Sequence, residues 1–162
     1  MKHWILIIAT VFSLNSLFAQ SGNPPYKQNT NLPTFKLQTV DKGTFTTAKL
    51  KKNVPVMIMF FSPGCDHCIH QFEDMQKRMN DLRKLQIVMA TWQPIEELAE
   101  FNKKYRVSQY THIVTGRDTE YFLPPFFEIA NFPHLAFYDK NWKLIGVHEG
   151  NMSIDNILAK FK

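Results

Sequence analysis

The sequence predicts an α/β fold in which a mixed central sheet is flanked by helices. First, Val54 to Phe61 is continuously apolar apart from a Pro near its start, which is typical of a strand buried on both faces of a sheet. Second, strand and helix patterns alternate after this segment, as they do in parallel, helix-covered sheets. Third, two alternating apolar segments flank Asp139-Lys140-Asn141 near the C-terminus, which predicts an antiparallel hairpin.

The N-terminus has the features of an export signal. Met1 to His3 is a short basic start, Trp4 to Leu14 is mostly apolar, and the small residue Ala19 precedes the expected cleavage point. The apolar segment is short for a membrane-spanning helix, which needs about 20 apolar residues. An uncleaved membrane anchor is the alternative, because Leu17 is larger than such cleavage sites prefer. We expect residues 1–19 to be a signal peptide and the mature protein to be soluble and periplasmic or otherwise exported.

Residues 20–31 are expected to form a flexible leader, since Ser21 to Asn31 is rich in Pro, Asn and Gln and lacks apolar periodicity. The remaining residues, 32–162, suit one domain with a single core, and twelve of the chain's fourteen Phe lie there and provide ample material for it. The formal net charge is +5, but the basic residues are scattered and no base-stacking pattern accompanies them. We therefore expect no nucleic-acid binding.

The domain begins with a predicted hairpin. Phe35 to Val40 alternates as a half-buried strand, Asp41 to Gly43 supplies the turn, and Thr44 to Thr46 forms the second strand. The buried strand at Val54 to Phe61 follows and leads into Cys65. Beyond the cysteines, apolar residues recur at steps of three and four, which predicts one helix with its buried stripe at Ile69, Phe72, Met75, Met79 and Leu82.

The rest of the domain alternates strand and helix and closes with a hairpin and a final helix. In chain order we expect a strand at Gln86 to Thr91, a helix from Pro94 to about Tyr105, a short strand at Thr111 to Val114, a short helix beginning in Leu123 to Phe127, a loop at Asn131-Phe132-Pro133, strands at His134 to Tyr138 and Leu144 to His148, and a helix N-capped by Ser153 that extends to Phe161. The pattern shows no second domain.

Cys65 and Cys68 are the only cysteines, and they lie at the predicted strand-to-helix junction. In an oxidising compartment such an isolated pair is typical of a redox site, because a four-residue ring restrains too little of the unfolded chain to act as a structural crosslink. A helix N-terminus presents unpaired N–H groups and the positive end of its dipole to a thiolate. The thiolate is the reactive form in thiol–disulfide exchange.

Together, a buried strand that delivers Cys-x-x-Cys to a helix, a later loop proline, a terminal hairpin and a final helix resemble the thioredoxin fold. The N-terminal hairpin and the long middle section are similar to the exported TlpA-like and redoxin branch, which is related to AhpC/TSA proteins and carries a central insertion. The resemblance covers about Leu32 to Phe161. It is most specific at Phe60 to Cys68, which ends in Cys-Asp-His-Cys, and at Phe132-Pro133.

The resemblance implies a thiol–disulfide oxidoreductase in which Cys65 is the exposed nucleophile and Cys68 the resolving thiol. Cys65 would attack a substrate disulfide, and Cys68 would release the product from the mixed disulfide. Two cysteines complete this cycle, so no cofactor is expected. The expected partners are exported protein thiols and disulfides and an unidentified redox partner protein, with membrane contact only if the signal is uncleaved.

Asp66 and His67, between the cysteines, are expected to tune the thiolate in opposite directions. A protonated His67 would favour the thiolate and Asp66 would disfavour it, each by on the order of 1 kcal/mol at about 6 Å. Because these effects largely cancel, the local charges do not choose between oxidase and reductase. The alternative for His67 is a solvated residue at the helix end.

Two positions depart from the family pattern. Thioredoxins usually carry a buried acid six residues before the first cysteine, where this chain has Met59. TlpA-like reductases often carry a Glu three residues after the second cysteine, where this chain has Gln71. The expected proton acceptor for Cys68 is therefore missing, and a water or His67 would have to serve.

Phe132-Pro133 resembles the loop whose cis-proline faces the cysteines and pairs with substrate backbone. The resemblance implies a cis bond before Pro133 and a substrate-binding role for both residues, with the bulky Phe132 narrowing the groove. The nearby aromatic segment Tyr121 to Phe127 is expected to be core of the insertion, with an apolar partner surface as the alternative.

Three other functions stay open at this point. Cys65, Cys68 and either His67 or His70 offer ligands for a metal such as copper, as in the related Sco-like proteins, although those carry three residues between the cysteines. Ser62-x-x-Cys65 resembles a peroxiredoxin motif but lacks that family's upstream Pro. The third alternative is a thioredoxin-fold binding module without turnover, which the missing proton acceptor keeps open.

Overall fold

The structure is a computed structural model that describes residues 23–162, and its centre is one mixed sheet. The strands are β1 Lys36–Gln38, β2 Thr44–Thr46, β3 Val56–Phe60, β4 Gln86–Thr91, β5 Ile113–Arg117, β6 His134–Tyr138 and β7 Leu144–Glu149. The helices are α1 Pro25–Gln28, α2 Asp66–Lys77, α3 Met79–Leu82, α4 Ile95–Lys104, α5 Leu123–Phe127 and α6 Ile154–Ala159, with short 3-10 turns at Thr47–Lys49 and Val107–Gln109. The predicted signal peptide, residues 1–19, lies outside the described residues.

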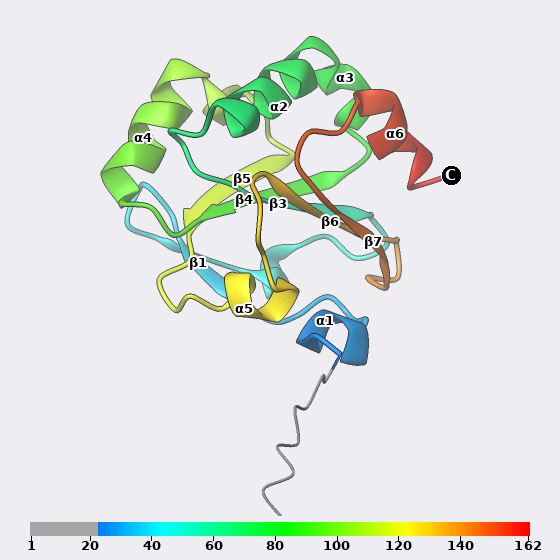
Figure 1. Cartoon of the computed structure of the whole chain (residues 1–162). Coiled ribbons are helices and arrows are strands. Elements are labelled where there is room, and N and C mark those ends of the chain that lie inside the picture. Colours follow the sequence, from blue (N-terminus) through cyan, green and yellow to red (C-terminus); the bar gives the residue numbers. More distant parts are fainter. Residues whose placement is uncertain (1–22) are drawn as a thin grey trace, which may run out of the picture.

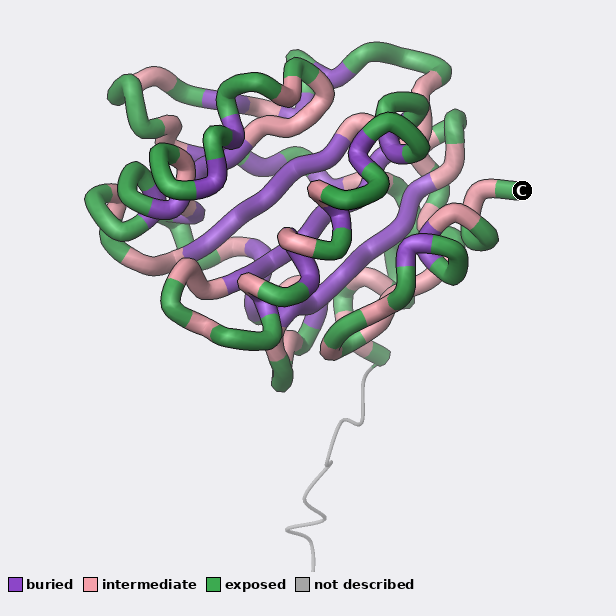
Figure 2. The backbone as a smooth tube through the Cα atoms, turned by 90° about the horizontal axis from the view of Figure 1, so that it is seen from above, coloured by how far each residue is buried: buried purple, intermediate pink, exposed green. Residues whose placement is uncertain are grey.

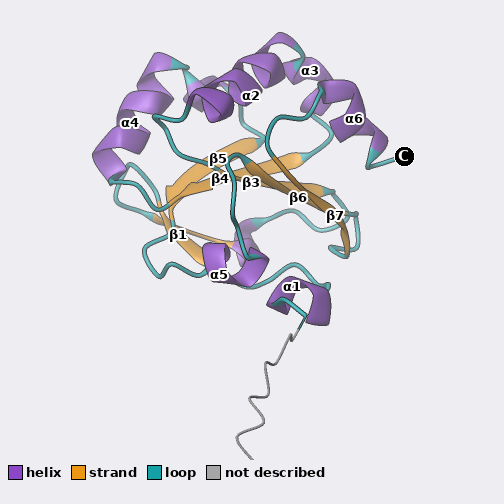
Figure 3. Ribbon diagram, viewed as in Figure 1, coloured by secondary structure: helices purple, strands orange, loops and turns teal. Residues whose placement is uncertain are grey.

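The sheet has seven strands in the order β2-β1-β5-β4-β3-β6-β7. Strands β3, β4 and β5 are parallel, and β6 and β1 join them antiparallel on either side. Helices α2, α3, α4 and α6 cover one face, while α1 and α5 lie on the other (Figures 1 and 3). The predicted mixed sheet flanked by helices is confirmed, as are both hairpins.

Strand β3 lies in the interior of the sheet, between β4 and β6, and all five of its residues are buried. Its side chains alternate between two cores. Met57 and Met59 face the layer of α2 and α4, while Val56, Ile58 and Phe60 face the layer of α5. The central strands are buried along most of their length in Figure 2, which explains why their sequence is continuously apolar rather than alternating. No helix within residues 23–162 is long and apolar enough to cross a membrane.

The predicted strand at Thr111 to Val114 is wrong in its limits, because β5 begins at Ile113 and ends at Arg117. The Ile113 N–H donates to the Tyr110 carbonyl (3.0 Å), so the two residues before the strand lie in a turn. The strand continues through Gly116, where a Cβ would lie only 2.5 Å from the Leu37 Cβ of the neighbouring β1. The missing side chain lets β1 approach closely, a role that a glycine inside a strand often has.

The helix predicted after the cysteines divides in two at Arg78, whose φ of −123° is not helical. The Arg78 guanidinium pairs with Asp81 and, at 3.1 Å, with Asp155 of α6. The last helix ends at Ala159 rather than Phe161, because the N–H groups of Lys160 and Phe161 bond to carbonyls three residues back and form a turn. The Phe161 ring packs on Phe137 of β6 (5.9 Å between centroids). The buried stripe is confirmed at Phe72, Met75, Met79 and Leu82, and the Ser153 cap is confirmed by its bond from the Asn156 N–H.

Part of the leader predicted to be flexible is packed on the domain instead. The Tyr26 ring of α1 lies 5.8 Å from the Phe127 ring of α5. The Leu144 N–H donates to the Thr30 carbonyl at 2.7 Å, which ties the segment to the start of β7. Composition alone could not show these contacts, because both partners lie about a hundred residues further along the chain.

Candidate active site

The turn between β3 and α2 places Cys65 at the helix N-terminus, as predicted. Cys65 is the N-cap residue of α2, with φ −87° and ψ 120°, and its side chain is partly exposed. Its N–H donates to the Ser62 carbonyl (3.1 Å), and its own carbonyl accepts from the Ile69 N–H (2.9 Å). The sulfur is therefore held on a short, hydrogen-bonded turn, next to the unpaired N–H groups of the first turn of α2.

Cys68 lies one helical turn further on and is completely buried. Burial raises the pKa of the Cys68 thiol strongly, and the adjacent Cys65 thiol raises it further, while a backbone hydrogen bond from Ser62 acts in the opposite direction. Both cysteines are free thiols in this structure. The pair thus consists of one thiol that a partner can reach and one that only its neighbour can reach.

Asp66 and His67 lie exposed on the first turn of α2. The His67 carbonyl accepts a hydrogen bond from the Asn151 side-chain amide at 2.7 Å. This bond uses the backbone and leaves the imidazole on the surface, so the structure ties the helix start to the loop before α6 without restraining the His67 ring.

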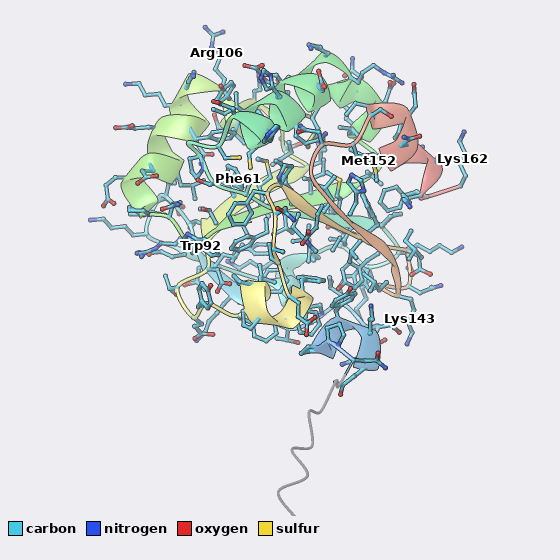
Figure 4. The ribbon with its side chains drawn as sticks, in the orientation of Figure 1. Phe61, Trp92, Arg106, Lys143, Met152 and Lys162 are labelled. Atoms are coloured by element: carbon cyan, nitrogen blue, oxygen red, sulfur yellow. The ribbon has the colours of Figure 1, made fainter. Side chains whose placement is uncertain are left out.

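Gln71 forms a second connection between α2 and that loop, which the sequence did not reveal. Its side chain is 1% exposed; its Nε2 donates to the Met152 carbonyl (3.1 Å) and its Oε1 accepts from the Met152 N–H (2.7 Å). Figure 4 shows Met152 on the loop that leads into α6, beside α2. Met59 lies in the same core cluster as Cys68. Neither position supplies a carboxylate near the buried thiol.

The predicted cis peptide bond between Phe132 and Pro133 is confirmed. Phe60 pairs with His134 across β3 and β6, so Pro133 lies opposite the turn that begins at Phe61. Phe132 and Cys65 both pack at the edge of the same core cluster. The structure therefore brings the cis-proline loop and the cysteines together at one edge of the sheet, although about 65 residues separate them in the sequence.

Glu149, at the end of β7, forms hydrogen bonds to the residues just before the cis-proline. Its carboxylate accepts from the Ala130 N–H (2.9 Å) and from the Asn131 amide (2.8 Å). Partial burial alone would raise the pKa of Glu149, but these hydrogen bonds outweigh it and lower the pKa. The Gly150 N–H adds a bond to the Pro133 carbonyl (2.8 Å). No local motif marks Glu149 for this role, because its partners lie on another segment.

His134 follows Pro133 directly and is 2% exposed on the α5 side of the sheet. Its Nδ1 lies 3.6 Å from a Glu149 oxygen, and neither ring nitrogen has a hydrogen-bond partner within residues 23–162. Burial lowers the pKa of His134, while Glu149 acts against this. The ring packs against Phe127, with 5.3 Å between the ring centroids.

Aromatic rings extend from the cis-proline loop across the adjoining surface. The Phe132 ring lies 5.2 Å from Trp92, and Trp92 lies 5.5 Å from Tyr121, which is 54% exposed. Trp92 is labelled in Figure 4. Further along the expected core segment, Leu123 and Phe127 are buried, as predicted for core of the insertion. Only its first residue, Tyr121, contributes an exposed ring.

Within residues 23–162, no three His, Cys, Asp or Glu side chains gather closely enough to hold a metal ion. The cysteines therefore have neither His67 nor His70 as a third ligand in this arrangement. The structure provides no observation in favour of the copper-binding alternative.

Comparisons with known proteins agree with this architecture. A model of the AhpC/TSA family matches residues 29–146, and no curated protein matches the sequence. A thioredoxin-family thiol:disulfide interchange protein from Chlorobium tepidum is similar in structure, with 20% identity, a TM-score of 0.67, and coverage of 86% of this chain and 94% of that one.

Two further solved structures are similar. One is a secreted Mycobacterium tuberculosis disulfide oxidoreductase homologous to E. coli DsbE, with 16% identity, a TM-score of 0.65, and coverage of 78% of this chain and 92% of that one. The other is the exposed lipoprotein thioredoxin Etrx1 of Streptococcus pneumoniae, with 23% identity, a TM-score of 0.61, and coverage of 78% and 96%. The expected thioredoxin fold is confirmed by these similarities.

Proposed function

This chain belongs to the AhpC/TSA family, and from that premise we propose that it is an exported thiol–disulfide oxidoreductase that exchanges disulfides with protein substrates through Cys65 and Cys68. The observation that carries the proposal is the asymmetry of the two thiols. Cys65 is partly exposed at the start of a twelve-residue helix, and Cys68 is fully buried one turn behind it. A crosslink that only stabilised the fold would not need one sulfur within reach of a partner.

In the proposed reductive direction, the Cys65 thiolate attacks one sulfur of a substrate disulfide. The substrate S–S bond breaks, a mixed disulfide forms on Cys65, and the other substrate sulfur leaves as a thiolate. Cys68 then loses its proton and attacks the Cys65 sulfur. The mixed disulfide breaks, the Cys65–Cys68 disulfide forms, and the substrate leaves with two electrons more than it brought. The same steps in reverse oxidise a substrate dithiol.

We propose that deprotonation of Cys68 limits the second step. Burial raises the pKa of this thiol, and the positions where related proteins carry an acid hold Met59 and Gln71. The Gln71 amide is engaged with Met152 and has no basic lone pair to accept a proton. The proton would leave to a water or to His67 on the first turn of α2.

Phe132 and Pro133 are the proposed substrate-binding residues. The cis-proline loop faces the Cys65 turn across the β3–β6 pair, and Glu149 and Gly150 hold its backbone in place. An extended substrate segment that lay along this loop would meet the rings of Phe132 and Trp92. This position suits a substrate with apolar residues near its cysteine.

The proposed export rests on the basic and apolar start of residues 1–19, with cleavage after Ala19 and a mature chain that consists of the leader and the domain at residues 32–162. Two of the similar structures are described as a secreted protein and an exposed lipoprotein. Both descriptions fit a compartment in which a Cys-x-x-Cys pair meets disulfides.

Trapping on Cys65 tests the proposed activity. In cells that express the whole chain, Cys68→Ser should accumulate mixed disulfides that a reductant releases, because the resolving thiol is absent. Cys65→Ser is the matched control and should trap none. If Cys68→Ser captures no exported protein, the chain is a binding module without turnover.

A redox titration of the purified mature protein separates the oxidoreductase from the metal-binding alternative. Free thiols are counted across a glutathione series with and without a chelator. A single two-electron transition that the chelator does not shift supports the oxidoreductase, whereas thiol protection that depends on a metal ion would contradict it.

A further inference from the structure

A cavity of about 700 Å³ lies at the end of the sheet opposite the cysteines. Its walls come from the ends of β4 and β5 where these strands begin, and from three neighbouring segments, residues 49–54, 83–85 and 109–112. Cys65 follows the other end of the parallel strands. The cavity is therefore separate from the proposed active site and needs its own explanation.

Cationic side chains dominate the rim of the cavity. Lys49, Lys51, Arg83 and Lys84 all line it, and no Asp or Glu does. Within residues 23–162, none of the four forms an ion pair with a carboxylate. By contrast, a few residues upstream, Lys77 pairs with Asp74 of its own helix, and Arg78 pairs with Asp81 and Asp155. The uncompensated positive charge is thus concentrated around the opening.

A buried, unpartnered nitrogen lies in the same wall. His112 Nε2 is inaccessible to solvent and has no hydrogen-bond partner within residues 23–162. The His112 backbone is held by the Ile87 N–H, which donates to its carbonyl at 2.9 Å. Burial, together with the charge of nearby Arg83, lowers the pKa of His112. In a neutral imidazole Nε2 is either a donor or an acceptor, and within residues 23–162 it has a partner for neither role.

The cavity has a mixed polar and apolar lining, and one of its loops is braced. Gln86 accepts from the Lys51 N–H (2.6 Å) and donates to the Lys51 carbonyl (2.9 Å), which fixes the segment that carries Lys51 against β4. The wall is therefore formed in the free protein rather than assembled by a ligand. Its apolar surface comes from Phe45, Leu50, Leu85, Ile87, Ile113 and Val114.

We propose that this cavity binds a small organic anion that combines an apolar body with a phosphate or carboxylate group. The apolar body would occupy the space between Leu50 and Ile113, and the charged group would lie beside Arg83 and Lys84 at the rim. The volume is within the range of about 300–1,000 Å³ that is usual for small-molecule sites. The cavity contains neither cysteine, so this proposal can be tested independently of the thiol chemistry.

Titration of the ¹⁵N-labelled mature protein with 1-naphthyl phosphate and with 1-naphthoate, followed by amide chemical shifts, tests the proposal. We expect at least one of them to bind saturably and to shift the amides of residues 83–87 and 109–114. Inorganic phosphate, which lacks the apolar body, and 1-naphthol, which lacks the charge, should each bind at least about tenfold more weakly. Raising the salt concentration from 50 to 500 mM should weaken binding to the wild-type protein.

The double variant Arg83→Gln/Lys84→Gln should lose about tenfold in affinity, because two partly screened charges are removed from the rim. Lys103→Gln/Lys104→Gln removes the same charge from the exposed end of α4 and should leave the affinity unchanged. Saturable binding that is equal in both double variants, equal affinity for 1-naphthol, or no shifts in residues 83–87 and 109–114 up to millimolar ligand would each overturn the proposal. If a variant does not fold, the salt series on the wild-type protein still tests the proposal, because binding that salt does not weaken would contradict it.

Discussion

Replacement of Gln71 by Glu puts an acid where TlpA-like reductases often carry one. In this protein we expect the replacement to lower the free energy of unfolding. Gln71 is 1% exposed and makes two reciprocal hydrogen bonds with the Met152 backbone, one as donor and one as acceptor. An ionised carboxylate keeps the acceptor role. It loses the donor and directs its second oxygen at the Met152 carbonyl.

The magnitude follows from these two bonds. The lost donor removes a net contribution of about 1 kcal/mol, and the part-buried Met152 carbonyl left without a partner costs about 1–3 kcal/mol more. We expect the free energy of unfolding of Gln71→Glu to fall by about 3 kcal/mol at pH 7.5. Folded domains are stable by roughly 5–15 kcal/mol, so the variant should remain folded but melt roughly 9 °C lower.

The loss should depend on pH with a definite sign. Burial disfavours the charged form, so the pKa of the introduced carboxyl lies above its unfolded value of about 4.3. Below that pH the carboxyl is protonated in both states and can donate to the Met152 carbonyl, so the variant matches the wild type. As the pH rises, the unfolded state loses its proton first, and stability falls by about 1.4 kcal/mol per pH unit until the folded state also ionises.

Urea unfolding followed by tryptophan fluorescence at pH 4 and pH 7.5 measures this, with the wild type at both pH values as reference. Gln71→Met is the matched control, since it removes both bonds without adding a charge and should be destabilised equally at the two pH values. If Gln71→Glu were as stable as the wild type at pH 7.5, the structural role of the Gln71–Met152 contact would be refuted. A loss of the same size at pH 4 would refute its electrostatic origin.

Three further predictions concern the site and its surroundings. In the reduced, folded protein, iodoacetamide at pH 8 should modify Cys65 at least about 100-fold faster than the buried Cys68, and peptide mass spectrometry that finds equal labelling would contradict the asymmetry. Glu149→Gln should destabilise the protein by about 1 kcal/mol at pH 7, because the ionised form of this group, whose pKa is lowered, holds the cis-proline loop. That loss should shrink as the pH falls below about 4, and the exposed control Glu128→Gln should show none in the same urea titrations. Asp118→Ala should cost about 2 kcal/mol in thermal unfolding, since the buried carboxylate accepts from two N–H groups at the start of α5, and an unchanged melting temperature would show that water replaces it.

Most of the fold could be predicted from the sequence, because its elements have strong local patterns. The apolar run of β3 and the apolar steps of α2 follow from burial on two faces of a strand and on one stripe of a helix. Where the local sequence pattern was weak, the predicted ends of the strands and helices were wrong. Strand β5 continues through Gly116, whose missing side chain allows β1 to pack closely against it. Helix α2 ends just before Arg78, which forms an ion pair with Asp155 of α6. These causes lie in distant segments and leave no local mark.

The candidate site divides in the same way. The sequence by itself determined the cysteine pair at a helix N-terminus, because this depends on residue identity and short-range spacing. The cis-proline loop and the missing acid at Met59 and Gln71 followed from the resemblance of the sequence to the thioredoxin fold. Only the tertiary structure decided that Gln71 binds Met152, that Glu149 holds the loop, and that basic side chains surround a cavity at the far end of the sheet. These arrangements join residues that are neighbours only after strands and helices pack, and side-chain geometry across that packing is not encoded in any local pattern.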